Sequence, residues 1–258
     1  MIKTKIRMFN ISSLNAINGS FKSVVNVALP DMTFHHEHIN NIYIMIDHCE
    51  VPNSFYIVNY TNNVLVINSI TYTVPVGNYN VNSLITVLLS ILPTGFTITY
   101  NSITSKYTFG YVSSFTIHAT KSTINNVIGL GSADLTGSSI ILPYLVNFLP
   151  IPRLSFHSTF LNNNNYSSSD GSADVFLCLQ NNVGQLSTIN YTNQTQSQYL
   201  VQEKSISNFI ITVTDDLGRL INFNNIDWFM TLILKIEYTD NTITNTNFNN
   251  IVKQQAIL

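Results

Sequence analysis

The stretch ISNFIITVTDDLGRLINFNNIDWFMTLILKIEY, residues 206–238, decides the fold class of this chain. It contains two runs rich in Ile, Val, Thr and Phe, at 206–214 and 228–238, with a shorter one at 220–223. Short runs of β-branched and aromatic residues bounded by Asn, Asp or Gly are typical of β-strands. Between Trp228 and residue 234 nearly every residue is apolar, which is typical of a strand covered on both faces. The stretch therefore predicts three strands and the turns between them.

Turn-forming residues separate these and other predicted strands. Asp and Gly between 206–214 and 220–223 favour a turn, because Asp can hydrogen-bond to its own backbone and Gly adopts conformations that other residues avoid. We expect Gly77 in particular to need such a conformation. The residues predicted to form turns or tight connections are Pro52, Asn53, Gly77, Asn78, Asp216 and Gly218.

The strand pattern recurs along most of the chain. Further strands are expected at 21–29, 42–49, 54–58, 64–68, 71–75, 95–100, 106–111, 115–119, 153–161 and 175–180. A short helix is expected at 80–92, with Asn80 or Asn82 as its N-cap, and another at 122–128, followed by Gly129. About a dozen strands with so few helices predict an all-β protein, an antiparallel sandwich or barrel.

Composition excludes several classes of protein. The chain has 258 residues, of which 45% are hydrophobic and only 9% are charged, and its net charge is −2. Soluble domains usually carry about 25% charged residues. A slightly negative chain does not bind nucleic acid over its whole surface, and apolar residues throughout the length argue against disorder. No apolar run approaches the roughly 20 residues of a membrane span, so we expect none.

The chain shows no Gly-rich or Pro-rich linker that would divide it into independent domains. We therefore expect one domain over 21–238, with a polar, loop-rich region around 162–200. The Asn-rich residues 239–258 are expected to form a flexible tail.

The N-terminal residues 1–20 differ in charge from the rest of the chain. They contain Lys3, Lys5 and Arg7 and no acid. Two interpretations are open. The segment is a frayed terminus, or it is a basic arm that orders on a neighbouring subunit or against phosphate.

The sequence gives little support for catalysis or for a bound cofactor. It has no nucleophile elbow, phosphate-binding loop or dinucleotide fingerprint. Histidines crowd at 35–38, but on a strand only His36 and His38 would share a face, so a polar turn is expected there and not a metal site. Cys49 and Cys178 are expected to be buried free thiols. We expect a protein that is not an enzyme and that binds no metal or cofactor.

Several motifs together resemble the single jelly-roll penton (minor capsid) proteins of virophages and Polinton-like double-stranded DNA viruses. The matching segments are VPNSFY at 51–56, VPVGNY at 74–79, NSITSKYTF at 101–109, VIGLG at 127–131 and TDDLGRLINFNN at 214–225, followed by Trp228. The resemblance implies an antiparallel jelly-roll sandwich with one or two short helices in its connecting loops. It also implies homopentamers at the vertices of an icosahedral capsid.

The same resemblance implies partners and a location. The partners would be a double jelly-roll major capsid protein and other minor capsid proteins, in a virion whose subunits are made in the host cytoplasm. Trp228 and Phe229 are expected to anchor the core or an interface. Lys3, Lys5 and Arg7 are candidate contacts to the capsid interior or to an adjacent subunit, and nucleic acid would be contacted only through this arm.

Two other functions remain open from the sequence. The chain could be a capsid cement or spike protein. Alternatively, it could be a lectin-like attachment module, in which aromatic rings of the polar region stack on glycans. The candidate stacking residues are Tyr166, Tyr191 and Tyr199.

Overall fold

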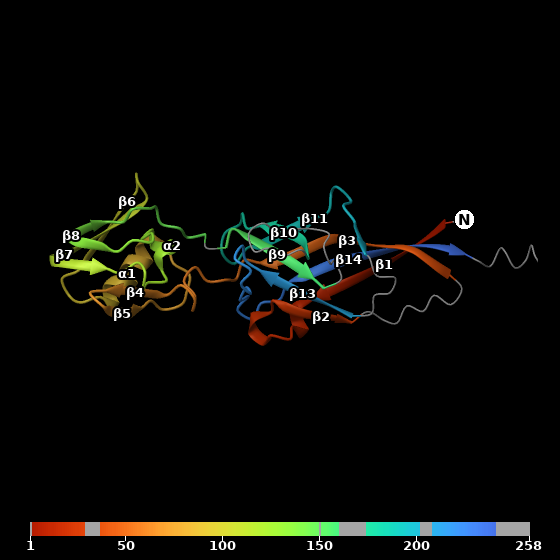
Figure 1. Ribbon diagram of the computed structural model, residues 1–258, viewed down its shortest axis with the longest axis horizontal. Helices are drawn as coiled ribbons and strands as arrows, with labels where there is room; N and C mark the ends of the chain where they lie inside the picture. The colour runs from red at the N-terminus through yellow and green to blue at the C-terminus, as the bar shows by residue number, and fades with distance from the viewer. Residues whose placement is uncertain (1, 29–36, 150, 160–173, 202–207, 241–258) are drawn as a thin grey trace, which may run out of the picture. The chain divides into compact units, whose positions relative to one another are not determined.

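The chain folds as two compact units, each with its own hydrophobic core. The computed structural model describes residues 2–28, 37–149, 151–159, 174–201 and 208–240 (Figure 1). Unit 1 consists of Met1–Phe55 together with Ile151–Leu258, and unit 2 is Tyr56–Pro150. Unit 2 is thus an insertion within the chain of unit 1. The expectation of a single domain over 21–238 is wrong, because the inserted strands and helices bury their apolar faces among themselves.

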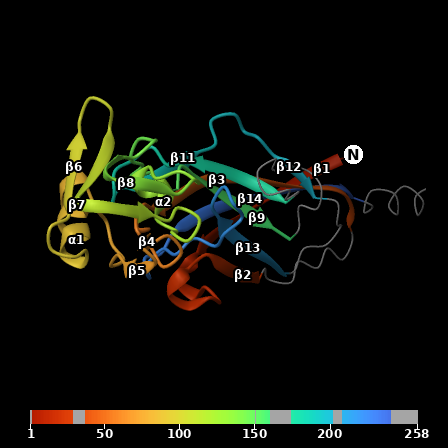
Figure 2. The same ribbon diagram turned by 60° about the vertical axis from the view of Figure 1, so that its left-hand side comes forward.

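Unit 1 is built from two antiparallel sheets. Sheet A has the strand order β1 (Ile2–Ser12), β14 (Phe229–Asp240), β3 (Glu37–Pro52) and β11 (Thr188–Thr192), and β12 (Tyr199–Val201) also pairs with β3. Sheet B has the order β10 (Val175–Gln180), β9 (Arg153–Ser158), β13 (Asn208–Thr214) and β2 (Val24–Ala28). Residues of both sheets share one core, and Figure 2 shows the strands from a second side.

The strand pairing in unit 1 is that of a jelly roll. β1 pairs with β14, β2 with β13, β3 with β11 and β12, and β9 with β10, always antiparallel. These pairs are nested from the chain ends inward, as in a long antiparallel ribbon that is rolled up into two facing sheets. The predicted fold class, an all-β antiparallel jelly roll with short helices in a connection, is confirmed.

Strand β14 lies inside sheet A, between β1 and β3. Its residues Met230, Leu232, Leu234 and Ile236 alternate along the strand and are buried in the core. The residues between them point away from the core, and Phe229 is 53% exposed. The apolar run at 228–238 therefore belongs to a central strand, as predicted, although its second face is only partly covered.

Unit 2 contains a five-stranded sheet and two helices. The strand order is β5 (Ile70–Thr73), β4 (Val64–Ile67), β7 (Lys106–Ile117) and β6 (Thr97–Asn101), and β8 (Leu135–Ile141) also pairs with β7. Helix α1 (Val81–Ile91) begins at Asn80, whose side chain accepts a hydrogen bond from the Ser83 amide while the Ser83 hydroxyl accepts one from the Asn80 amide. Helix α2 (Asn125–Ile128) ends at Gly129. Both predicted helices are present, and of the two candidate caps Asn80 is the one used.

One loop of unit 1 holds the chain on both sides of the insertion. This loop connects β10 to β11. The Asn53 side chain donates hydrogen bonds to the carbonyls of Val183 and Gly184, at 3.0 and 3.1 Å. The Asn181 side chain donates to the Ile151 carbonyl at 3.0 Å. Asn53 and Asn181 are 4% and 3% exposed, so buried contacts within unit 1 fix the chain just before and just after the insertion, and no glycine-rich linker is present there.

The N-terminal segment is a strand of sheet A, so the basic arm expected at 1–20 is wrong for most of its length. β1 pairs with β14 from Ile2 to Ser12 and places Ile11 in the core. The reason is that the apolar strand β14 needs a hydrogen-bonding partner on each of its edges. At the other end of the chain β14 extends to Asp240, two residues into the predicted tail, and residues 241–258 lie outside the described residues.

Candidate assembly surface

The face of sheet A that points away from the core carries exposed apolar side chains. Because side chains alternate along a strand, the residues between the core-facing ones all lie on this face. Five of them are large and apolar, and their exposed fractions lie between 46% and 67%. We call them the sheet A patch: Ile2, Ile6, Met8, Leu200 and Phe229.

The strands between these residues complete the same face. In one row across the sheet, Ile233 pairs with Met8 on one side and with Met45 on the other. Both Ile233 and Met45 are partly exposed. Contiguous exposed apolar surface of this kind marks sites where soluble proteins bind other proteins.

Two charged groups on this face, Lys235 and Glu237, are paired with each other. The Lys235 ammonium lies 3.0 Å from a Glu237 carboxylate oxygen and 5.1 Å from the centre of the Tyr43 ring. The Asn41 side chain also donates a hydrogen bond to Glu237, and these two hydrogen bonds lower the pKa of the Glu237 carboxyl, that of Asn41 most. A face whose charges are already paired loses less on being covered than one with isolated charges.

Trp228 is a core anchor. Its side chain is fully buried, its indole nitrogen donates a 2.7 Å hydrogen bond to the Lys22 carbonyl, and its ring meets Phe156 edge to face at 5.4 Å. The Trp228 amide also donates to the Ser13 hydroxyl at 2.9 Å. The interface role considered for Trp228 is therefore wrong, whereas Phe229, exposed on the sheet A patch, remains an interface prediction.

A partly buried ion pair supports the position of Trp228. The Lys22 ammonium lies 3.2 Å from a carboxylate oxygen of Asp227, and it also donates a hydrogen bond to the Leu14 carbonyl at 3.0 Å. The Ser13 hydroxyl donates to the same Asp227 oxygen at 3.0 Å. These contacts fix the segment between β1 and β2 against the start of β14.

Replacing Trp228 with alanine should destabilise unit 1 strongly. Truncation of a buried Trp leaves a large cavity, and here it also leaves the Lys22 carbonyl without its donor, so we expect a loss of about 3–5 kcal/mol. Denaturant unfolding followed by far-UV circular dichroism measures the change. Phe229→Ala, next to it in sequence but exposed, should cost less than about 1 kcal/mol. Equal losses for the two variants would contradict the assignment of Trp228 as the anchor.

The turn after β13 is organised by Asp215 and not by the predicted Asp216. Gly218 has a positive φ of 72°, as a turn glycine requires. The side chain that organises the turn is Asp215, whose Oδ1 accepts hydrogen bonds from the amides of Leu217 and Arg219, both at 2.9 Å. Asp216 instead forms an ion pair with Arg153 at 3.2 Å. The signal that could have found Asp215 is its position three residues before Gly218, where type I turns favour Asp.

The other predicted turn residues have different roles. Gly77 exchanges two backbone hydrogen bonds with Val58, at 2.9 and 3.1 Å, and does not have a positive φ. The expectation of a special backbone conformation at Gly77 is therefore wrong, because the chain forms an antiparallel bridge there. Asn78 accepts a hydrogen bond from the Ile57 amide at 3.1 Å. Pro52 is the last residue of β3, and Asn53 holds the start of the insertion as described above.

The basic N-terminal residues are positions of a strand. Lys3, Lys5 and Arg7 pair in register with three β14 residues, Tyr238, Ile236 and Leu234. β1 forms the edge of sheet A, and basic residues on an edge strand discourage pairing with other sheets. Their contacts to a capsid interior or to another subunit remain predictions.

The two candidate glycan-stacking residues that the structure describes do not form an exposed platform. Tyr191 and Tyr199 are partly buried and pack against the core of unit 1, and desolvation raises the pKa of Tyr191. Tyr166 lies outside the described residues.

The candidate reactive groups of the sequence are also dispersed. In the described part of the chain no three His, Cys, Asp or Glu side chains come together as a metal site requires, and His36 is not among the described residues. Burial raises the pKa of the Cys49 thiol far above its usual range, which keeps it protonated. Cys178, expected to be buried, is exposed on β10, which lies at the edge of sheet B.

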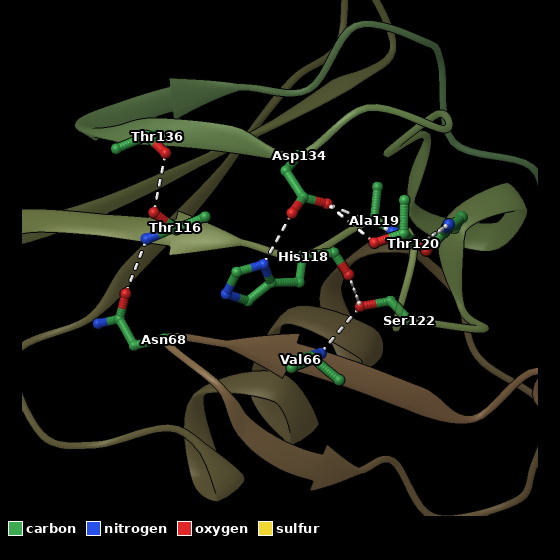
Figure 3. A network of polar contacts seen from close by, with 10 residues as sticks. Val66, Asn68, Thr116, His118, Ala119, Thr120, Ser122, Asp134 and Thr136 are labelled. Atoms are coloured by element: carbon green, nitrogen blue, oxygen red, sulfur yellow. Dashed lines mark hydrogen bonds and ion pairs between the residues drawn. The ribbon is translucent and has the colours of Figure 1, made fainter.

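A polar network in unit 2 joins three strands (Figure 3). A ring nitrogen of His118 lies 2.7 Å from Asp134, and this hydrogen bond is the largest cause of the lowered pKa of the Asp134 carboxyl. The Ser122 hydroxyl donates to the His118 carbonyl and accepts from the Val66 amide, while Thr116 contacts a threonine of β8 at 2.8 Å. The network therefore connects β4, β7 and β8, so these polar residues have a structural role in holding the strands together.

No protein-family model and no curated protein sequence matches the chain. The fold is similar to that of a mavirus penton protein. The superposition on the crystal structure of the selenomethionine-labelled mavirus protein covers 90% of this chain and 99% of the mavirus chain, with 9% sequence identity and a TM-score of 0.46. In the part of the chain that the structure describes, no helix is long and apolar enough to span a membrane.

Proposed function

We propose that this protein is a minor capsid protein, a penton subunit that forms homopentamers at the vertices of an icosahedral virus shell. The sequence motifs support a penton, and a jelly-roll sandwich is a common architecture of capsid subunits. The observation that carries the proposal is the sheet A patch. It presents five large apolar side chains on one face of a rigid sheet, where a second subunit can cover them.

The proposed role includes partners and a location. The pentamer would contact a double jelly-roll major capsid protein and other minor capsid proteins in the virion, after synthesis in the host cytoplasm. The protein would act by assembly and not as an enzyme. The low charge content supports this, because interface cores are depleted of charged residues.

Charges placed on the sheet A patch should prevent assembly. Native mass spectrometry of the wild-type protein should show a species of five times the 29.0 kDa chain. Met8→Glu combined with Phe229→Glu should give a monomer at the same concentration, because two buried carboxylates without partners cost several kcal/mol at each contact. Ile103→Glu is the matched control. Ile103 is 93% exposed in unit 2, and its variant should still form pentamers.

Two results would contradict the proposal. A wild-type protein that stays monomeric across salt and pH, with and without the major capsid protein, would exclude a penton. A stable trimer instead of a pentamer would favour the cement or spike function.

A further inference from the structure

We propose that neighbouring copies contact each other through two different surfaces, the sheet A patch of one copy and a second apolar patch of the next. This inference rests on the proposed homopentamer. The second patch, which we call the loop patch, consists of four side chains with exposed fractions of 64%, 63%, 40% and 43%. They are Leu14, Ile17, Phe21 and Ile226.

The loop patch is formed by two connecting segments that are fixed to each other. Leu14, Ile17 and Phe21 lie between β1 and β2, in a connection that contains two 3-10 turns, Ser13–Asn15 and Gly19–Phe21 (Figure 1). Ile226 lies in the segment that leads into β14. The Phe21 carbonyl accepts a hydrogen bond from the Phe223 amide at 2.9 Å, and a second backbone bond of 2.8 Å joins residues 225 and 20.

The ion pair of Lys22 and Asp227 fixes the same two segments from the inside. Lys22 also donates to the carbonyl of Leu14, the first residue of the loop patch. The apolar side chains are therefore presented by a rigid backbone, so little conformational entropy is lost when another surface covers them. Rigid, preorganised apolar side chains are suited to bind a partner surface.

Closed rings require two unlike surfaces on each subunit. A patch that binds its own copy produces a two-fold dimer, whereas a ring of five closes only if one surface of each subunit binds a different surface of the next. In the described part of unit 1, the sheet A patch and the loop patch are two such surfaces. Both are apolar, and the charged residues described beside each one, Lys235 with Glu237 and Lys22 with Asp227, are paired within the subunit.

The exposed area of the two patches matches the apolar part of one interface. The nine side chains are on average about half exposed. With about 150–200 Å² for a fully exposed large side chain, they offer roughly 750–1,000 Å². A stable interface buries about 1,200–2,000 Å², of which about 56–65% is apolar, so it needs roughly 700–1,300 Å² of apolar surface. The second copy of this chain is therefore an occupant of the right size for both patches.

Mixing two single variants tests the inference. Met8→Glu blocks the sheet A patch, and Ile17→Glu blocks the loop patch, so each variant alone should be a monomer in native mass spectrometry. In an equimolar mixture, with one variant isotope-labelled, the intact sheet A patch of the Ile17→Glu chain can bind the intact loop patch of the Met8→Glu chain. We expect mixed dimers containing one chain of each kind, at least tenfold more abundant than dimers of either variant alone, and no rings.

The control replaces an exposed residue outside both patches, and the folding check applies to every variant. Ile103→Glu should keep the pentamer, as above, and Ile17→Ser should weaken it without introducing a charge. Near-UV circular dichroism of each variant should match the wild type, because the replaced side chains are exposed.

The outcomes separate this inference from the proposed function. A wild-type protein without pentamers contradicts the proposed function itself. A wild-type pentamer that persists in the Ile17→Glu variant contradicts only the assignment of the loop patch. Dimers formed by Ile17→Glu alone, with none in the Met8→Glu sample, would show that the sheet A patch binds its own copy, which also overturns the inference.

Discussion

Removal of residues 1–12 should leave unit 1 unable to reach its native fold. These residues contain all of β1, which is hydrogen-bonded to β14 along its entire length. Without β1, the edge of β14 is left unpaired and the core loses Ile11. Neighbouring core residues of β14, such as Met230 and Leu232, become accessible to water. A domain is stable by only about 5–15 kcal/mol in total, and we expect loss of a whole strand to exceed this margin.

The measurement is the solubility and the denaturant unfolding curve of the truncated chain. The matched control keeps the strand and removes its charges, by Lys3→Gln, Lys5→Gln and Arg7→Gln together. This variant should fold, because each replaced side chain remains long and its backbone still pairs with β14. If the truncated chain unfolded at the same denaturant concentration as the full chain, β1 would be a dispensable arm after all.

Replacing Gly129 with alanine should unfold unit 2 or destabilise it by at least about 4 kcal/mol. Gly129 has a φ of 80°, a conformation that costs a residue with a side chain about 1–2 kcal/mol. In addition, a Cβ at this position would lie 2.8 Å from the Leu145 carbonyl oxygen and closer still to that of Tyr144. The backbone at Tyr144 would have to move, and its 3.0 Å hydrogen bond to the Gly129 carbonyl would be lost.

Hydrogen exchange measured on the whole protein reports this effect by position. Protection should fall in β7, β8 and α1 of unit 2 and should be retained in β14 of unit 1. Gly77→Ala is the control, since the atoms nearest to a Cβ at Gly77 belong to the Tyr79 ring, at an ordinary contact distance of 3.6 Å, and the backbone there is not strained. Its cost should stay below about 1 kcal/mol. Similar protection in both alanine variants would show that the segment beside Gly129 can shift without loss.

The sequence predicted those parts of the fold that depend on local signals. The N-cap of α1 at Asn80 depends on a residue three positions away, Ser83, and such short-range pairs are visible in a single sequence. The strand at 228–238 was visible from its apolar run. β1 was missed because Lys3, Lys5 and Arg7 alternate with other residues in a way that resembles a basic tail. Only the presence of β14 beside it, more than two hundred residues later, makes it a strand.

The division into two units could not be predicted either. A linker of Gly or Ser would have indicated it, but the chain on both sides of the insertion is fixed within unit 1 by the buried side chains of Asn53 and Asn181. Their partners lie far away along the chain, and a single sequence does not show which distant residues meet. For the same reason the apolar residues of the loop patch, such as Ile17, could not be distinguished from core residues.

The sequence predicted the position of the turn after β13 correctly, but it assigned the turn to Asp216 and not to Asp215. Two adjacent acids precede Gly218, and either could form the turn by composition alone. The choice is made by geometry, since only the Asp215 carboxylate faces the amides of Leu217 and Arg219. For Trp228 the sequence left a core and an interface position open, and the structure places its ring in the core, where the indole nitrogen bonds to the Lys22 carbonyl.

The loop between β10 and β11 makes the insertion point a suitable place for other inserted sequences. Because one loop fixes both the departure of the chain at Asn53 and its return at Ile151, the length and composition of what lies between them do not set the register of β3 or β9. The junctions beside Phe55 and Ile151 are therefore the positions at which a foreign domain can be displayed on unit 1.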